Sequence, residues 1–198
     1  MIKEAIKKLV AGNDLTFDEA AQVMDEMFSG TATQSQMAAY LTALRIKGET
    51  IDEITASAQV MREKALHIKP NRDVLDIVGT GGDGTGTFNI STTAAFIIAA
   101  AGIPVAKHGN RSMSSKSGSA DCLEQLGINI NITPEKSEEV LNKAGICFMF
   151  AQGYHSSMKY VGPVRKEIGI RNIFNVLGPH KPCRRRPSGN GCVFGDTC

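Results

Sequence analysis

A glycine-rich segment, Gly79 to Thr92 (GTGGDGTGTFNIST), has the residue types of an anion-binding loop. Its glycines let main-chain N–H groups turn inward around phosphate oxygens, and a helix beginning near Ser91 or Thr92 adds donors and a positive dipole end. Asp83 does not suit a bare phosphate, because its carboxylate needs ribose hydroxyls or a Mg²⁺ ion as a partner. We therefore predict a phosphorylated, pyrophosphate-bearing ligand. The alternative is a merely flexible glycine loop.

A second polar segment, residues 107–127, follows a predicted strand. Lys107 ends that strand, where an ammonium can pair with a pyrophosphate or with negative charge on a departing group. His108 and Asn110 lie on the same turn and are candidates for contact with a second, planar substrate. Ser119 ends a serine-rich loop that leads into a helix, which favours phosphate oxygens. The alternatives are a structural histidine and a solvated loop.

A third segment, residues 151–179, follows another predicted strand and carries two further candidates. His155 and Arg165 are candidates for binding a carboxylate, because a guanidinium can grip that planar group with two hydrogen bonds. The alternative for each is a surface charge or a structural pair.

The elements that must position these residues change in kind along the chain. Apolar residues recur at helical spacing in the first seventy residues, and Thr16, Thr33 and Thr50 each open a capping box, which predicts four helices there. Beyond that segment, runs of strand length at 74–78, 104–106 and 146–150 alternate with helical patterns at 92–101, 120–126 and 134–144. This order predicts an α/β domain with a mainly parallel central sheet, whose ligands bind beyond the carboxyl ends of the strands.

The composition limits the classes of protein to which the chain can belong. The chain has 198 residues, a formal charge of +2 and 42% hydrophobic residues, which favours an ordinary globular protein over one that binds nucleic acid or a membrane. No signal-peptide pattern opens the sequence, so we expect a cytoplasmic protein. Five cysteines without paired spacing indicate neither a disulfide framework nor a zinc site, and we expect Cys122 and Cys147 to be small buried residues.

Three signatures together resemble anthranilate phosphoribosyltransferases: the loop GTGGDGTGTFNIST, then KHGNRS followed by SGSAD, and then GPVRKEIGIRNIFNVLGP. The resemblance covers residues 1–179. Pyrimidine nucleoside phosphorylases have a related fold and a shorter version of the loop, but their second motif differs. They are the alternative, together with a non-catalytic ligand-binding or dimerisation fragment.

The resemblance implies transfer of the phosphoribosyl group from phosphoribosyl pyrophosphate (PRPP) to anthranilate in tryptophan biosynthesis, with Mg²⁺ and in a homodimer formed through the helical domain. The implied PRPP-binding positions are Gly79, Gly82, Asp83, Thr87, Asn89, Ser91, Thr92, Lys107 and Ser119, of which Ser91 also reaches the metal and Lys107 stabilises the leaving group. The implied anthranilate-binding positions are Gly79, His108, Asn110, His155 and Arg165. No residue is identified as a general base.

The expected domains are a helical domain over 1–70 and a partial α/β domain over 71–179, with 163–175 packing against the helical domain. Residues 180–198 lack periodicity and depart from the family pattern, and we interpret them as a frameshifted, disordered tail. The alternative is a basic tail, Arg184 to Arg186, that binds nucleic acid or an acidic partner. Because relatives carry a metal-binding Asp-Glu pair beyond this point, we expect the chain as given to be poorly active or unstable.

Overall fold

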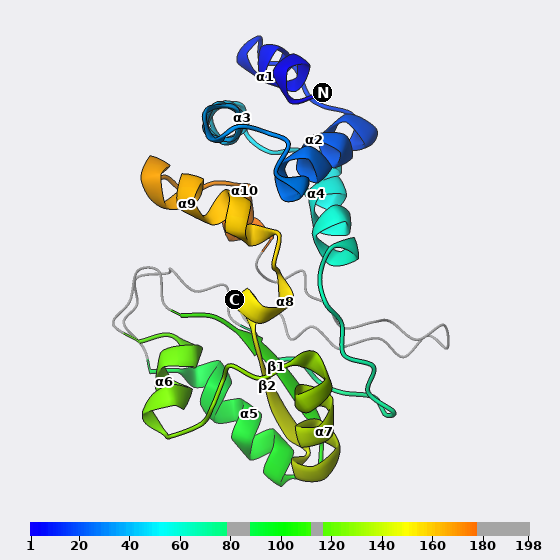
Figure 1. Cartoon of the computed structure of the whole chain (residues 1–198), viewed down its shortest axis with the longest axis vertical. Coiled ribbons are helices and arrows are strands. Elements are labelled where there is room, and N and C mark those ends of the chain that lie inside the picture. Colours follow the sequence, from blue (N-terminus) through cyan, green and yellow to red (C-terminus); the bar gives the residue numbers. More distant parts are fainter. Residues whose placement is uncertain (79–87, 112–116, 178–198) are drawn as a thin grey trace. The chain divides into compact units, whose positions relative to one another are not determined.

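The computed structural model of the chain describes residues 1–78, 88–111 and 117–177 (Figure 1). They form two compact units. Unit 1 contains residues 1–65 and 155–177, and unit 2 contains the described part of residues 66–154. The domain limits expected from the sequence stay a prediction, because a compact unit in a structure need not be an independently folding domain.

Unit 1 is helical, as its periodicity predicts. Each of the three helices that follow α1 opens on a threonine whose hydroxyl accepts a main-chain N–H and whose own N–H is bound by a Glu or Gln three residues later. The predicted capping boxes at Thr16, Thr33 and Thr50 are confirmed. The helices of this unit are α1 Ile2–Val10, α2 Phe17–Ser29, α3 Gln34–Lys47, α4 Ile51–Glu63, α9 Met158–Ile168 and α10 Ile173–Val176.

A buried carboxylate joins two turns of unit 1. Glu53 is fully buried; its Oε1 accepts the N–H of Leu15 at 2.9 Å, and its Oε2 accepts the N–H of Thr50 at 2.8 Å. Lys47 neutralises this charge, with 3.0 Å between Nζ and Oε2. A buried charge is tolerated when it is paired and hydrogen-bonded, so Glu53 stabilises the scaffold.

Unit 2 contains a parallel pair of strands, β1 Val105–Gly109 and β2 Ile146–Phe150, in which Val105 lies opposite Ile146 and Gly109 opposite Phe150. The strand order and helical cover confirm the predicted α/β class with a parallel sheet. Figure 1 shows the helices of this unit around the two strands. They are α5 Ile90–Ala100, α6 Ser119–Gln125, α7 Pro134–Ala144 and α8 Ala151–Tyr154.

Side chains of successive β2 residues pack on opposite faces of the sheet. Cys147 and Met149 pack with Leu141 of α7, whereas Phe148 and Phe150 pack with Leu123 of α6. Cys147 is buried as predicted, while the same prediction for Cys122 is wrong, because that residue of α6 is half-exposed.

The third predicted strand is present only in part. Leu75 forms an isolated parallel bridge with Val105, and the rest of the predicted run over 74–78 is not strand. Beyond Leu75 the side chain of Asp76, instead of a main-chain carbonyl, accepts the N–H of His108 at 3.1 Å. The pairing of this run with β1 therefore stops within two residues of Leu75.

Apolar residues are most concentrated in α5, where Ile90 and Ile97 lie exposed. This helix has 11 residues. None of the helices in the described ranges combines the length and the apolar character needed to cross a bilayer.

Candidate functional site

Lys107 is a buried cation of unit 2. Its Nζ donates to the carbonyl oxygen of Ile77 at 2.7 Å and to Oγ of Ser91 at 3.2 Å, and the residue is 4% exposed. Burial lowers the pKa of Lys107, and the charge of Asp76 works against this shift. An ammonium has three donors, and these two neutral oxygens use two of them. Lys107 can therefore still bind an anion.

Helix α5 begins beside this ammonium. Asn89 stands at its N-cap but makes no side-chain capping bond, so the first-turn N–H groups lack that partner. Thr92 is 3% exposed, and its Oγ1 has no hydrogen-bond partner among the described residues. Because a buried polar atom is normally hydrogen-bonded, this hydroxyl is suited to a ligand oxygen.

The start of α6 lies against the end of β1. Oγ of Ser119 donates to the carbonyl oxygen of Asn110 at 3.3 Å, and Nδ2 of Asn89 donates to Oγ of Ser117 at 3.4 Å. Gly109 makes this approach possible, because a Cβ there would collide with the Ser119 hydroxyl and would lie 2.7 Å from the Phe148 ring. The sequence motifs did not single out Gly109, since only the packed neighbours show that its side chain must be absent.

Arg111 is held by two carboxylates of α6. Its Nη1 lies 3.0 Å from Oδ1 of Asp121 and 2.5 Å from Oε2 of Glu124, and its Nη2 lies 2.8 Å from Oε1 of Glu124. Oδ2 of Asp121 also accepts the N–H of Gly118 at 2.8 Å. Arg111 and Gly118, on either side of residues 112–116, are thus both hydrogen-bonded to side chains of α6. The sequence reasoning missed this arrangement, although Asp121 and Glu124 have the spacing of one helix face.

His108 and Lys107 are adjacent but do not share a face of the sheet. His108 lies opposite Met149 and Lys107 opposite Phe148, and these two β2 residues pack on different faces. His108 is 6% exposed. The two neighbours therefore cannot contact one ligand from the same face of the sheet.

Arg165 is the candidate cation of unit 1. Its Cζ lies 5.2 Å from the centre of the Phe174 ring, and its Nη2 lies 3.5 Å from Oδ1 of Asn175. Its Nε is buried with no hydrogen-bond partner among the residues that the structure describes, and burial lowers the pKa of Arg165. No carboxylate of the described ranges forms an ion pair with it. A half-buried guanidinium without a carboxylate is suited to an anionic ligand.

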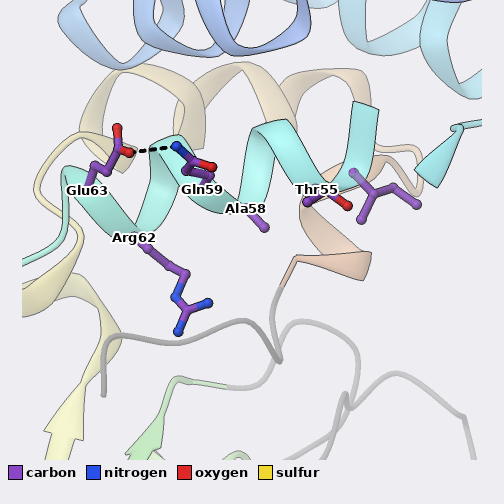
Figure 2. A pocket seen from close by; sticks show the side chains of 6 residues that line it. Thr55, Ala58, Gln59, Arg62 and Glu63 are labelled. Carbon is purple, nitrogen blue, oxygen red and sulfur yellow. Dashed lines mark hydrogen bonds between the residues drawn. The ribbon is translucent and has the colours of Figure 1, made fainter. Parts of the chain in front are cut away.

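The hollow on α4 in Figure 2 is a separate feature of unit 1. Thr55, Ala58, Gln59, Arg62 and Glu63 line it, and Nε2 of Gln59 donates to Oε1 of Glu63 at 2.9 Å. None of the predicted site residues lines this hollow.

The structure brings together some of the predicted residues. Lys107 contacts Ser91, Ser119 contacts Asn110, and Asn89 joins the starts of α5 and α6. Of the residues predicted to bind anthranilate, His108 and Asn110 belong to unit 2, whereas His155 and Arg165 belong to unit 1. Gly79, Gly82, Asp83 and Thr87 lie outside the described residues, as does the tail from His180.

Two family models match the sequence. Residues 3–65 match the helical bundle domain of a glycosyl transferase family, and residues 71–187 match the a/b domain of that family. The chain belongs to this glycosyl transferase family. The second match includes the first residues of the segment that we interpreted as an aberrant tail, and the frameshift stays a hypothesis.

Similar proteins of this glycosyl transferase family are anthranilate phosphoribosyltransferases, which confirms the predicted resemblance. The enzyme of that name from Endomicrobium trichonymphae is 63% identical over 179 residues, which are 90% of this chain and 53% of the relative. The crystal structure of anthranilate phosphoribosyltransferase from Thermus thermophilus matches with a TM-score of 0.82 and 46% identity, covering 89% of this chain and 54% of that one.

A third match is a ligand complex. Anthranilate phosphoribosyltransferase from Saccharomyces cerevisiae in complex with PRPP and Mg matches with a TM-score of 0.82 and 28% identity, covering 90% of this chain and 54% of that one. The glycosyl transferase chain described here thus spans about half the length of the relatives that it matches.

Proposed function

We propose that the protein transfers the phosphoribosyl group from PRPP to anthranilate, which gives N-(5-phosphoribosyl)anthranilate and pyrophosphate for tryptophan biosynthesis. The observation that supports it best is the position of the buried Lys107 ammonium, 3.2 Å from Ser91 at the uncapped start of α5. An anion placed there meets a cation, a helix N-terminus and the Thr92 hydroxyl. The names of the similar proteins supply the substrates.

PRPP binding is assigned to two walls. We assign the loop positions Gly79, Gly82, Asp83 and Thr87 to one, and the start of α5 with Lys107 and Ser119 to the other. The bond from C1 of the ribose to pyrophosphate breaks, the bond from C1 to the anthranilate nitrogen forms, and the nitrogen loses a proton to solvent. Lys107 stabilises the charge that develops on the leaving pyrophosphate. An aryl amine can attack before it loses its proton, so no strong base is required.

Mg²⁺ suits the position beside Ser91 only when PRPP is bound as well. Ser91 offers a hydroxyl oxygen, the kind of ligand that Mg²⁺ prefers. This oxygen also accepts a hydrogen bond from the Lys107 ammonium. Two cations beside one hydroxyl need the negative charge of a pyrophosphate between them. The ion would neutralise the leaving group, and Ser91 would hold it there.

Anthranilate binding is assigned to Gly79, His108, Asn110, His155 and Arg165. The carboxylate of anthranilate suits Arg165, whose guanidinium has no carboxylate partner among the described side chains. Phe174 and Asn175 hold that guanidinium in one orientation, which lowers the entropic cost of binding.

The assembly and location are also part of the proposal. We infer a cytoplasmic homodimer that associates through the helical unit. Unit 1 exposes several large apolar side chains, of which Val10, Ile46 and Ile51 are the most exposed, and burying them between two copies of the chain would be favourable.

Calorimetric titration tests the proposal on the purified chain. PRPP with Mg²⁺ should bind the unmodified chain, and Lys107→Met should weaken binding at least tenfold, as expected for losing a charge-assisted contact. Lys3→Met, which removes an exposed charge from α1, is the control and should bind normally. Heat on adding a nucleoside with phosphate but none with PRPP would favour a nucleoside phosphorylase instead.

A further inference from the structure

The end of the pairing between Leu75 and β1 has an unusual hydrogen-bond pattern. The N–H of Leu75 donates to the carbonyl oxygen of Pro104, and the carbonyl oxygen of Leu75 accepts the N–H of Ala106, both at 2.9 Å. A regular parallel ladder would continue with the carbonyl of Ile77 accepting the N–H of His108. Instead, Oδ1 of Asp76 accepts that N–H at 3.1 Å.

The carbonyl that the ladder no longer uses has another partner. The oxygen of Ile77 accepts Nζ of Lys107 at 2.7 Å, and the same Nζ donates to Oγ of Ser91 at 3.2 Å. If Ile77 were paired with His108, its carbonyl would lie in the ladder and would be less accessible to the ammonium. The carboxylate of Asp76 therefore takes the place of a main-chain acceptor, one residue before the carbonyl that holds Lys107.

We propose that Asp76 is a positioning residue: its carboxylate ends the ladder at His108 and thereby directs the carbonyl of Ile77 to the Lys107 ammonium. Its part in PRPP binding rests on the proposed function. Asp76 touches no reacting atom in this role, because it acts through Lys107. The sequence placed Asp76 within the predicted strand run 74–78 and did not single it out.

Three variants test the proposal. Asp76→Ala removes the acceptor and the charge, Asp76→Asn keeps an acceptor oxygen of the same shape, and Asp73→Asn changes an exposed carboxylate three residues earlier as the control. Amide hydrogen exchange of His108 measures how its N–H is paired, and the rate of Lys107 acetylation is measured relative to exposed Lys143. Asp76→Ala and Asp76→Asn lose the same charge, so the difference between their acetylation rates measures how firmly the ammonium is held. Circular dichroism checks that each variant is folded, and calorimetry measures PRPP with Mg²⁺.

In Asp76→Ala we expect acetylation of Lys107 to be about tenfold faster or more, the order expected for losing a hydrogen bond to a charged group. The N–H of His108 then either exchanges faster or is protected by the carbonyl of Ile77, which would no longer hold Lys107. Asp76→Asn should show smaller changes in the same direction, and Asp73→Asn none. Unchanged acetylation in both Asp76 variants, or equal acceleration in the two, would overturn the proposal.

The ligand measurement separates the two proposals. If the unmodified chain binds PRPP, Asp76→Ala should bind it about tenfold more weakly or worse, and equal binding would contradict the role of Asp76 in that site. If the unmodified chain does not bind PRPP, the proposed function fails. Faster acetylation in Asp76→Ala than in Asp76→Asn would still establish Asp76 as the residue that positions Lys107.

Discussion

The segment that follows β1 and the α9–α10 segment each contain an arginine beside an aromatic ring, yet the two arginines differ in their partners. Arg111 lies 5.6 Å from the Phe150 ring and binds the carboxylates of Asp121 and Glu124. Arg165 lies 5.2 Å from the Phe174 ring and has an amide oxygen as its described polar partner. A ligand at Arg111 must compete with two carboxylates, whereas one at Arg165 need not. The difference indicates a structural role for Arg111 and supports the proposed binding role of Arg165.

Replacing Arg165 should have the largest effect on binding. Arg165→Ala should weaken anthranilate binding by about 2–5 kcal/mol, the range for truncating one partner of a desolvated charged pair. Arg165→Lys should recover only part of the loss, because an ammonium cannot form the two parallel hydrogen bonds. Quenching or enhancement of anthranilate fluorescence, in the presence of PRPP and Mg²⁺, measures the affinity. Exposed Arg171→Ala should bind normally, and an equal loss in that control would contradict the assignment.

A methyl group at Gly109 tests the packing near Arg111. Gly109→Ala should lower the free energy of unfolding by about 1–3 kcal/mol, because the new Cβ overlaps Ser119 and the Phe148 ring. Gly153→Ala is the matched control in the same unit, since nothing lies within 4 Å of a Cβ there. Urea denaturation measures both variants. Equal stability of the two would show that α6 can move away without cost.

The Phe174 ring beside Arg165 should contribute less to anthranilate binding than the guanidinium itself does. Phe174→Leu should weaken anthranilate binding by about 0.5–2 kcal/mol, because the cation–π contact that orients the guanidinium is lost. Leucine retains most of the packing against Phe28, whose ring centre lies 6.0 Å away. The same fluorescence titration applies. A PRPP affinity that falls as much as the anthranilate affinity would indicate general damage to unit 1.

The ion pairs of Arg111 should have the smallest effect, and one that depends on pH. The hydrogen bond from Arg111 holds the pKa of Glu124 below its ordinary value of 4.5. The pair therefore stabilises the fold fully above about pH 4.5, and the contribution is lost as the pH falls through the lower folded-state pKa. Glu124→Gln should lower the thermal midpoint slightly at pH 7, and the difference should shrink as the pH falls below about 4.5. High salt should also reduce it, since the pair is exposed.

Local signals predicted several elements of both units from the sequence. Helix α7 and strand β2 have the predicted limits, 134–144 and 146–150, and Thr133 and Gly145 cap α7. N-caps and left-handed glycines act within one turn of the chain, so they can be read without knowledge of the fold. The run at 74–78 could not be assigned in this way, because its pairing ends where the side chain of Asp76 meets His108 of another strand.

The sequence by itself determined the family, the helical and α/β classes and the residue types of an anion site, because these depend on periodicity and on motifs of neighbouring residues. Only the tertiary structure decided which cations are already paired. Arg111 finds its carboxylates 10 and 13 residues away, and Lys107 finds the carbonyl of Ile77 30 residues away. Charge is a property of a residue, but its availability to a ligand depends on neighbours that folding brings from distant parts of the chain.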